Sequence, residues 1–194
     1  MSIRRPRPRA ALVVLLVAGL MALTGCTELQ GTGDKGYVTG DGAVEQLPVA
    51  ERESPVELSG DTIDGGTVDL ADFRGAPVVV TVWGSWCGPC RAEAPEVAGA
   101  ADDLEGTAQF VGIVLRDDPD AAQAFATASG FDFPSIDSPG GEALLRFPGA
   151  LGPRTIPAFV VLDAQGRIAA SIIGQLPSRL TLTELVEEVA AEDG

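Results

Sequence analysis

The stretch Trp83-Gly84-Ser85-Trp86-Cys87-Gly88-Pro89-Cys90 decides the fold of this chain, because two secondary-structure patterns meet in it. Four valines and a threonine fill positions 78–82 before it, and such a β-branched run predicts a buried strand. Arg91-Ala92-Glu93-Ala94 follows and indicates the opening of a helix. Two cysteines separated by two residues therefore stand where a central strand gives way to a helix.

The position of the two cysteines predicts thiol–disulfide exchange. A helix N-terminus carries unpaired amide N–H groups and partial positive charge, which favour a thiolate over a thiol. Cys87 is therefore expected to be the nucleophile. Cys90 lies one turn further into the helix and can close an intramolecular disulfide with it.

Two other interpretations of the cysteine pair have less support from the sequence. A structural disulfide across two residues would remove little chain entropy and stabilise the fold poorly. A zinc site needs four ligands, and the sequence holds one further cysteine, Cys26, and no histidine. We therefore predict no metal site, and no cofactor apart from a redox-active disulfide between Cys87 and Cys90.

The octet resembles the active site of the thioredoxin superfamily. Pro95 matches a proline in the active-site helix of these proteins, and Thr155-Ile156-Pro157 resembles their cis-proline loop. From Pro55 onward the chain is similar to the membrane-anchored TlpA/ResA-like thiol–disulfide oxidoreductases, which work in cytochrome c maturation. The resemblance implies a thioredoxin-like α/β fold, with a central mixed β-sheet flanked by helices, an N-terminal β-hairpin and a helical insertion.

The same resemblance implies roles for the residues around the cysteines. Trp86, Gly88 and Pro89 shape the active-site motif. Pro157 is expected to follow a cis peptide bond and to face the cysteines, and a trans turn proline is the alternative. The backbone of Ile156 is expected to pair with the substrate by strand addition, in which main-chain bonds give the affinity.

Glu93 is a candidate proton acceptor. Thioredoxin has a buried aspartate at the position of Thr81, which cannot serve as a base. The membrane-anchored relatives have a glutamate at the position of Glu93, three residues after Cys90 and on the same helix face. Glu93 can take the proton of the Cys90 thiol. Alternatively, it is a solvated carboxylate near the positive end of the helix.

Residues 1–25 are typical of an export signal. Four arginines precede the apolar run 10–23, which is short for a membrane span. Leu23-Thr24-Gly25-Cys26 resembles a bacterial lipobox, which implies lipidation of Cys26 and an extracytoplasmic domain anchored to the outer face of the cell membrane. An uncleaved anchor, or a plain signal peptide with an incidental cysteine, are the alternatives.

The rest of the chain divides into a tether and a domain. Residues 26–54 are rich in glycine and are predicted to be the lipidated cysteine and a flexible tether, with a short strand at Tyr37-Val38 as the alternative. Residues 55–194 are predicted to form the thioredoxin-like domain, beginning with a hairpin of 56–58 and 67–70. The strand–helix order predicts parallel crossovers and helices on both faces of the sheet.

The net charge of the chain limits the classes of molecule that it can bind. The formal net charge is −15, and without the four arginines of residues 1–25 it is −19. Such a chain does not bind nucleic acid by counter-ion release, and basic partners suit it. The resemblance implies protein disulfide substrates such as apocytochrome c, a membrane thiol electron donor, and a monomer.

Direction of electron flow is the open question. The dipeptide Gly88-Pro89 is that of reducing thioredoxins, which favours a reductant of protein disulfides. One alternative is an oxidant that forms disulfides in secreted proteins. The other is a lipoprotein that uses a thioredoxin fold to bind partners without catalysis.

The lipobox gives a first prediction. Cys26→Ser removes the thiol that would receive the diacylglycerol, so the variant should leave the detergent phase in phase partitioning, or accumulate unprocessed. The mass of the mature protein checks the same point, because lipidation adds acyl chains to the new amino terminus. Unchanged partitioning together with an unchanged mass would refute lipidation.

Overall fold

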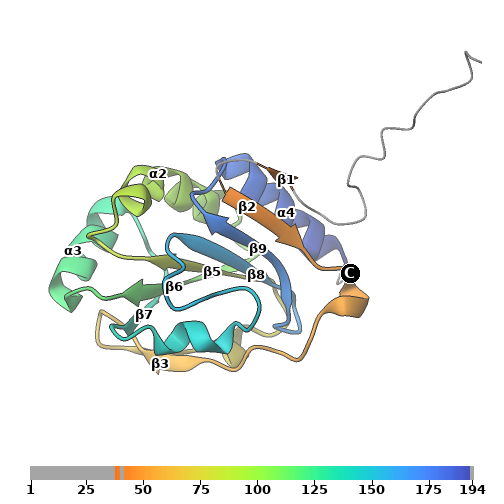
Figure 1. The fold of residues 1–194 in the computed structure, drawn as a ribbon, viewed down its shortest axis with the longest axis horizontal. Coiled ribbons are helices and arrows are strands. Elements are labelled where there is room, and N and C mark those ends of the chain that lie inside the picture. The colour runs from red at the N-terminus through yellow and green to blue at the C-terminus, as the bar shows by residue number, and fades with distance from the viewer. Residues whose placement is uncertain (1–37, 40–41, 193–194) are drawn as a thin grey trace, which may run out of the picture. The chain divides into compact units, whose positions relative to one another are not determined.

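The computed structural model of the protein describes residues 38–39 and 42–192, and strand β5 (Val78–Trp83) lies inside its central sheet (Figure 1). All six residues of β5 are buried. The strand pairs in parallel with β6 (Gln109–Leu115) and antiparallel with β8 (Ala158–Leu162). With neighbours on both sides and layers on both faces, β5 has no wet face, which explains why Thr81 is the single polar residue in its sequence.

The main sheet of the described residues has seven strands in the order β1-β2-β9-β8-β5-β6-β7. Its remaining members are β1 (Val38–Thr39), β2 (Gly42–Gln46), β7 (Ser135–Ser138) and β9 (Ile168–Gly174). The β5–β6 and β6–β7 pairs are parallel and the other pairs are antiparallel. The sheet is therefore mixed, and the thioredoxin-like α/β fold expected from the sequence is confirmed.

The alternating side chains of β5 enter two separate cores. Val79 and Trp83 pack in a cluster with residues of three helices, α2 (Gly88–Asp103), α3 (Pro119–Ser129) and α4 (Arg179–Glu192). Residues 78, 80 and 82 pack on the other face, in a cluster that contains no residue of these helices. None of the described helices is both long and apolar enough to cross a membrane.

The second face is covered by short elements, and the helices predicted there are 3-10 helices rather than α-helices. One cover is η3 (Glu142–Arg146), a 3-10 stretch that buries Leu144. It starts after Gly141, which has a φ of 80°, and Pro148 follows closely, so there is no room for a longer helix.

The other cover is the predicted N-terminal hairpin, formed by β3 (Ser59–Asp61) and β4 (Thr67–Asp69) and followed by η2 (Leu70–Phe73). The first strand was expected at 56–58. Those residues do contribute Val56 and Leu58 to the core, but the strand pairing begins one step later, at Ser59.

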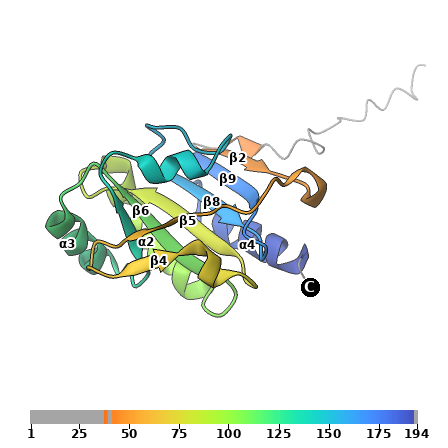
Figure 2. The same cartoon turned by 90° about the horizontal axis from the view of Figure 1, so that it is seen from below.

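Residues 42–54 belong to the folded domain, so the tether predicted for 26–54 is too long and the domain does not start at 55. Strand β2 pairs with β9 from Gly42 opposite Gly174 to Gln46 opposite Ala170. After η1 (Val49–Glu51), the chain crosses the sheet from the β9 side to the β7 side (Figure 2). The predicted signal peptide and Cys26 lie outside the described residues.

Arg52 fastens this crossing segment to the domain. Its side chain is fully buried, and its guanidinium contacts Asp163 at 3.3 Å and also Glu192 of α4. Its Nε donates a hydrogen bond to the carbonyl of Leu47. Burial alone would raise the pKa of Asp163, but hydrogen bonds from Arg167 and Arg52 outweigh burial and hold that pKa below its usual range.

Replacing Arg52 tests whether residues 42–54 are structural. Arg52→Met should lower the free energy of unfolding by about 3 kcal/mol, the lower end of the range for breaking a buried ion pair, because Asp163 keeps Arg167 as a partner. Urea unfolding of the two proteins measures the difference.

The matched control is Arg179→Met, which breaks the exposed Arg179–Asp103 pair. It should cost about 0–1 kcal/mol. Equal losses in the two variants would show that Arg52 does not hold the segment to the domain.

Candidate active site

The junction between β5 and α2 places both cysteines at a helix N-terminus, as the sequence predicts. Cys87 is the N-cap residue of α2, and its sulfur accepts a hydrogen bond from the backbone N–H of Cys90 at 3.3 Å. The two cysteines form a disulfide, with their Cα atoms 5.2 Å apart. Both are buried in the cluster that α2 forms with the sheet.

The side chain of Trp86 contacts the end of β6 and is not packed in the core. It is 49% exposed, and its indole Nε1–H donates to the carbonyl of Leu115 at 2.9 Å. The guanidinium carbon of Arg116 lies 5.1 Å from the centre of the tryptophan ring, within cation–π distance. Gly84 makes this possible, because a Cβ there would lie 2.8 Å from the indole nitrogen.

Asp117 fixes the turn between β5 and Cys87, and the sequence analysis did not identify it. Its carboxylate accepts hydrogen bonds from both the backbone N–H and the hydroxyl of Ser85, the latter at 2.9 Å. The neighbouring Asp118 caps α3, because its carboxylate accepts hydrogen bonds from the N–H groups of Asp120 and Ala121. Two successive aspartates before one helix were the available signal.

Two arginines flank this turn in a strongly acidic protein. Arg91 donates from its guanidinium to the carbonyl of Ser85 at 3.2 Å and lies over the ring of Phe125. Arg116 lies over Trp86 and adopts a φ of 50°, in the left-handed region that non-glycine residues rarely occupy. Both arginines contact residues of the turn before Cys87, and the N-terminus of α2 adds partial positive charge at the cysteines, which favours a thiolate on reduction.

Glu93 is buried, so the alternative of a solvated helix carboxylate is wrong. The residue is 8% exposed, and its carboxylate accepts a hydrogen bond at 2.8 Å from the backbone N–H of Leu176, in the loop before α4. Burial raises the pKa of Glu93, and the Leu176 hydrogen bond opposes this only in part. Among the described residues, Leu176 is its hydrogen-bond partner, and neither cysteine bonds to its carboxylate.

Pro157 follows a cis peptide bond, and the register of the sheet places it at the active-site end. Ala158, the next residue, pairs with Val82 at the end of β5. The Pro157 carbonyl accepts a hydrogen bond from Gly174. Ile156 is half-buried against the cluster that contains both cysteines, and its backbone N–H and carbonyl have no hydrogen-bond partner among the described residues.

The predicted site residues therefore meet in one region. Tertiary structure brings the cis-proline loop, from far along the chain, to the strand end that carries the cysteine motif. Gly88 and Pro89 form the exposed first turn of α2 between the two cysteines. Cys26 falls outside the described residues, so its lipidation stays a prediction.

The protein has a mixed sheet, a Cys-x-x-Cys disulfide where a central strand is followed by a helix, and a cis-proline at the same end of the sheet. Together these features define a protein of the thioredoxin superfamily. A family model described as Redoxin matches residues 48–189. The match covers most of the chain, and the chain belongs to this family.

Known proteins of similar sequence are named as thiol–disulfide exchange proteins. The chain is 33% identical over 107 residues to the thiol:disulfide interchange protein HelX of Rhodobacter capsulatus, a match that covers 55% of this chain and 57% of HelX. It is 25% identical over 162 residues to the thiol-disulfide oxidoreductase ResA of Bacillus thuringiensis, covering 83% of this chain and 88% of ResA.

One solved structure extends the likeness to three dimensions. A secreted thiol-disulfide isomerase from Corynebacterium glutamicum superposes with a TM-score of 0.71 at 28% identity, covering 76% of this chain and 92% of the other. At this level the likeness concerns both fold and sequence. The prediction of a TlpA/ResA-like member of the thioredoxin superfamily is confirmed.

The buried Glu93 gives a prediction about stability and pH. Since its folded pKa is raised, the folded protein keeps this proton where the unfolded chain has lost it. The free energy of unfolding should therefore fall as pH rises from the ordinary glutamate value through the raised one. Glu93→Gln keeps an acceptor for Leu176 and removes the titration, so its stability relative to the parent should increase across that pH window.

Guanidinium unfolding of the oxidised proteins at a series of pH values measures this difference. Glu96→Gln, on an exposed position of the same helix, is the control and should show no such trend. If the Glu93→Gln and parent curves stay parallel at every pH, burial does not raise the Glu93 pKa.

Proposed function

We propose that this protein is an extracytoplasmic, membrane-tethered thiol–disulfide oxidoreductase that reduces disulfides in other proteins. The observation that carries the proposal is the Cys87–Cys90 disulfide at the start of α2, beside the unpaired backbone of Ile156. The redox names of HelX and ResA support it. The secreted relative supports the extracytoplasmic location, and the lipobox at Cys26 supports the tether.

Substrate recognition follows from the loop before β8. An extended substrate segment can bond to the free N–H and carbonyl of Ile156, which adds a strand-like pairing without selecting a particular sequence. Pro157 has no N–H to compete for the same acceptor. The exposed ring of Trp86 offers apolar contact area beside the cysteines.

The exchange then runs in two steps. In the reduced protein, the Cys87 thiolate attacks one sulfur of the substrate disulfide, that S–S bond breaks, and one substrate thiolate leaves. Cys90 gives its proton to the carboxylate of Glu93 and attacks the sulfur of Cys87. The second substrate thiolate leaves and the Cys87–Cys90 disulfide forms. Two electrons have moved from the protein to the substrate.

The raised pKa of Glu93 suits this role, because a carboxylate of ordinary acidity is a weak proton acceptor near neutral pH. Asp117 acts through Ser85 as a positioning residue for the turn that carries Cys87. A membrane thiol donor would return the protein to the dithiol form by the reverse exchange. Cytochrome c maturation is the process we propose, with apocytochrome c as a substrate.

The trapping experiment uses the Cys90→Ser variant. Without Cys90 the mixed disulfide between Cys87 and the substrate cannot be resolved, so an adduct should accumulate that survives a non-reducing gel and disappears with reductant. Mass spectrometry of the adduct identifies the partner. The control is Cys87→Ser, in which the remaining buried cysteine should trap at least about tenfold less if Cys87 is the nucleophile.

The identity of the trapped partners decides between the candidate functions. Apocytochrome c or a few assembly proteins would support a dedicated reductant. A broad set of secreted proteins would favour general disulfide formation. No adduct from a folded Cys90→Ser protein would favour a binding protein without catalysis.

A further inference from the structure

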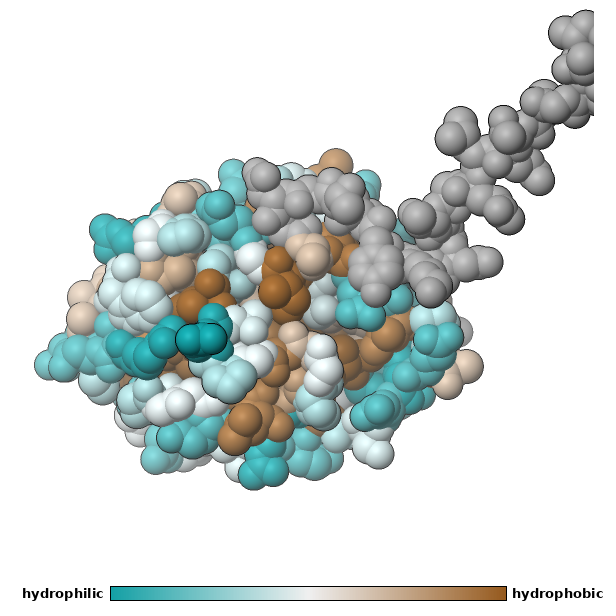
Figure 3. Space-filling model, viewed as in Figure 1, coloured by the Kyte–Doolittle hydropathy of each residue, from teal (hydrophilic) through white to brown (hydrophobic). Residues whose placement is uncertain are grey.

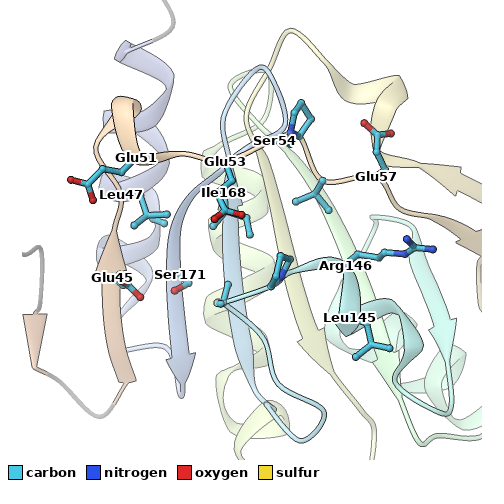
Figure 4. A pocket seen from close by; sticks show the side chains of 16 residues that line it. Glu45, Leu47, Glu51, Glu53, Ser54, Glu57, Leu145, Arg146, Ile168 and Ser171 are labelled. Carbon is cyan, nitrogen blue, oxygen red and sulfur yellow. The ribbon is translucent and has the colours of Figure 1, made fainter.

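A cavity of about 530 Å³ lies away from the disulfide, between the β2–β9 part of the sheet and two crossing segments (Figure 4). Residues 51–57 form one wall, and residues 145–150 at the end of η3 form another. Its volume falls within the roughly 300–1,000 Å³ typical of ligand pockets. None of the residues that form or flank the disulfide lines it.

The walls of the cavity are largely apolar. Leu47, Val56 and Ile168 contribute to them, together with Leu145, which is 70% exposed. On the face shown in Figure 3, apolar residues gather in the middle and hydrophilic residues border them. An apolar patch bordered by polar residues is typical of an interaction surface.

The margin of the cavity is acidic, and three of its four glutamates are unpaired within the described residues. Glu45, Glu51 and Glu53 line it, and none of them has an ion pair within the described part of the chain. Glu57 also lines it and lies 3.4 Å from Arg74. Arg146 is the cation among the lining residues, so carboxylates outnumber it. The margin therefore attracts positive charge.

Ser171 contributes a polar group to the wall of the cavity. Ser171 on β9 is 5% exposed and lies opposite Glu45 of β2, and the side chains of both are seen at the cavity in Figure 4. Its hydroxyl forms no hydrogen bond with any described residue. Because Ser171 lines the cavity, its hydroxyl is available to bond to a molecule that enters.

We propose that this cavity binds a segment of a partner protein in which apolar side chains are flanked by lysine or arginine. Apolar side chains would fill the space between Leu47, Ile168 and Leu145. The flanking cations would meet the unpaired carboxylates at the margin, and the Ser171 hydroxyl would bond to the backbone of the segment. The site is separate from the disulfide and gives the protein a second contact with its partners.

A short peptide probes this site directly. The probe is acetyl-Arg-Leu-Leu-Arg-amide, titrated to millimolar concentration into the oxidised, isotope-labelled protein while amide chemical shifts are recorded. We expect the shifts to concentrate on β2, β9, 51–57 and 145–150 and to be absent from 83–91 and 156–157. Acetyl-Glu-Leu-Leu-Glu-amide and acetyl-Arg-Ser-Ser-Arg-amide should each bind at least about tenfold more weakly, a difference of about 1.4 kcal/mol.

Matched variants separate a local site from general charge attraction. The triple variant Glu45→Gln, Glu51→Gln, Glu53→Gln should weaken binding of the probe about tenfold, equivalent to about 1.4 kcal/mol. The triple variant Glu105→Gln, Glu184→Gln, Glu187→Gln removes the same charge from exposed positions outside the cavity and should weaken it less than about twofold, or about 0.4 kcal/mol. Ser171→Val should also weaken binding, and the unfolding midpoint of each variant confirms that it folds.

The proposal is overturned by any of three results. They are equal weakening by the two triple variants, shifts confined to the disulfide region, or no shifts at millimolar probe.

Discussion

The parallel pairing of β5 with β6 is the interaction on which the candidate site depends. It places Trp83 opposite Val114, so the loops that follow the two strands leave the same edge of the sheet. The last residue of β6 supplies the carbonyl of Leu115 for Trp86, and the loop after β6 supplies the carboxylate of Asp117 for the turn before Cys87. The cysteine motif is therefore held in place by a neighbouring strand as well as by its own helix.

Buried polar contacts join parts of the domain that are far apart in the sequence. Arg52 connects the segment after β2 to Asp163 in the β8–β9 turn and to Glu192 at the end of α4. Glu93 connects the active-site helix to the loop before α4 through Leu176. Because an unpaired buried charge is costly, each contact requires its distant partner and fixes the position of that segment.

The domain separates two kinds of charge. Arg91 and Arg116 lie at the turn that carries the disulfide, where positive charge favours a thiolate. The cavity beside β2 and β9 has an excess of carboxylates at its margin. The proposed roles therefore use different residues of one acidic domain: those at the turn stabilise the reacting sulfur, and those at the cavity margin attract a basic partner segment.

The sequence alone determined the fold class and the centre of the candidate site. The β-branched run at 78–82 and the cysteine pair after it are local signals, because a buried strand and a helix N-terminus each leave a pattern within a few residues. The hairpin was placed to within a few residues, and the Ile156–Pro157 loop was assigned by its resemblance to the cis-proline loop of the thioredoxin superfamily. Tertiary structure decided what depends on contacts between distant residues: the pairing of β2 with β9, the burial of Glu93 against Leu176, and the contact of Asp117 with Ser85. The first two leave no local pattern, and the paired aspartates before α3 do not show which segment Asp117 contacts, because each contact arises only when separate segments of the chain pack together.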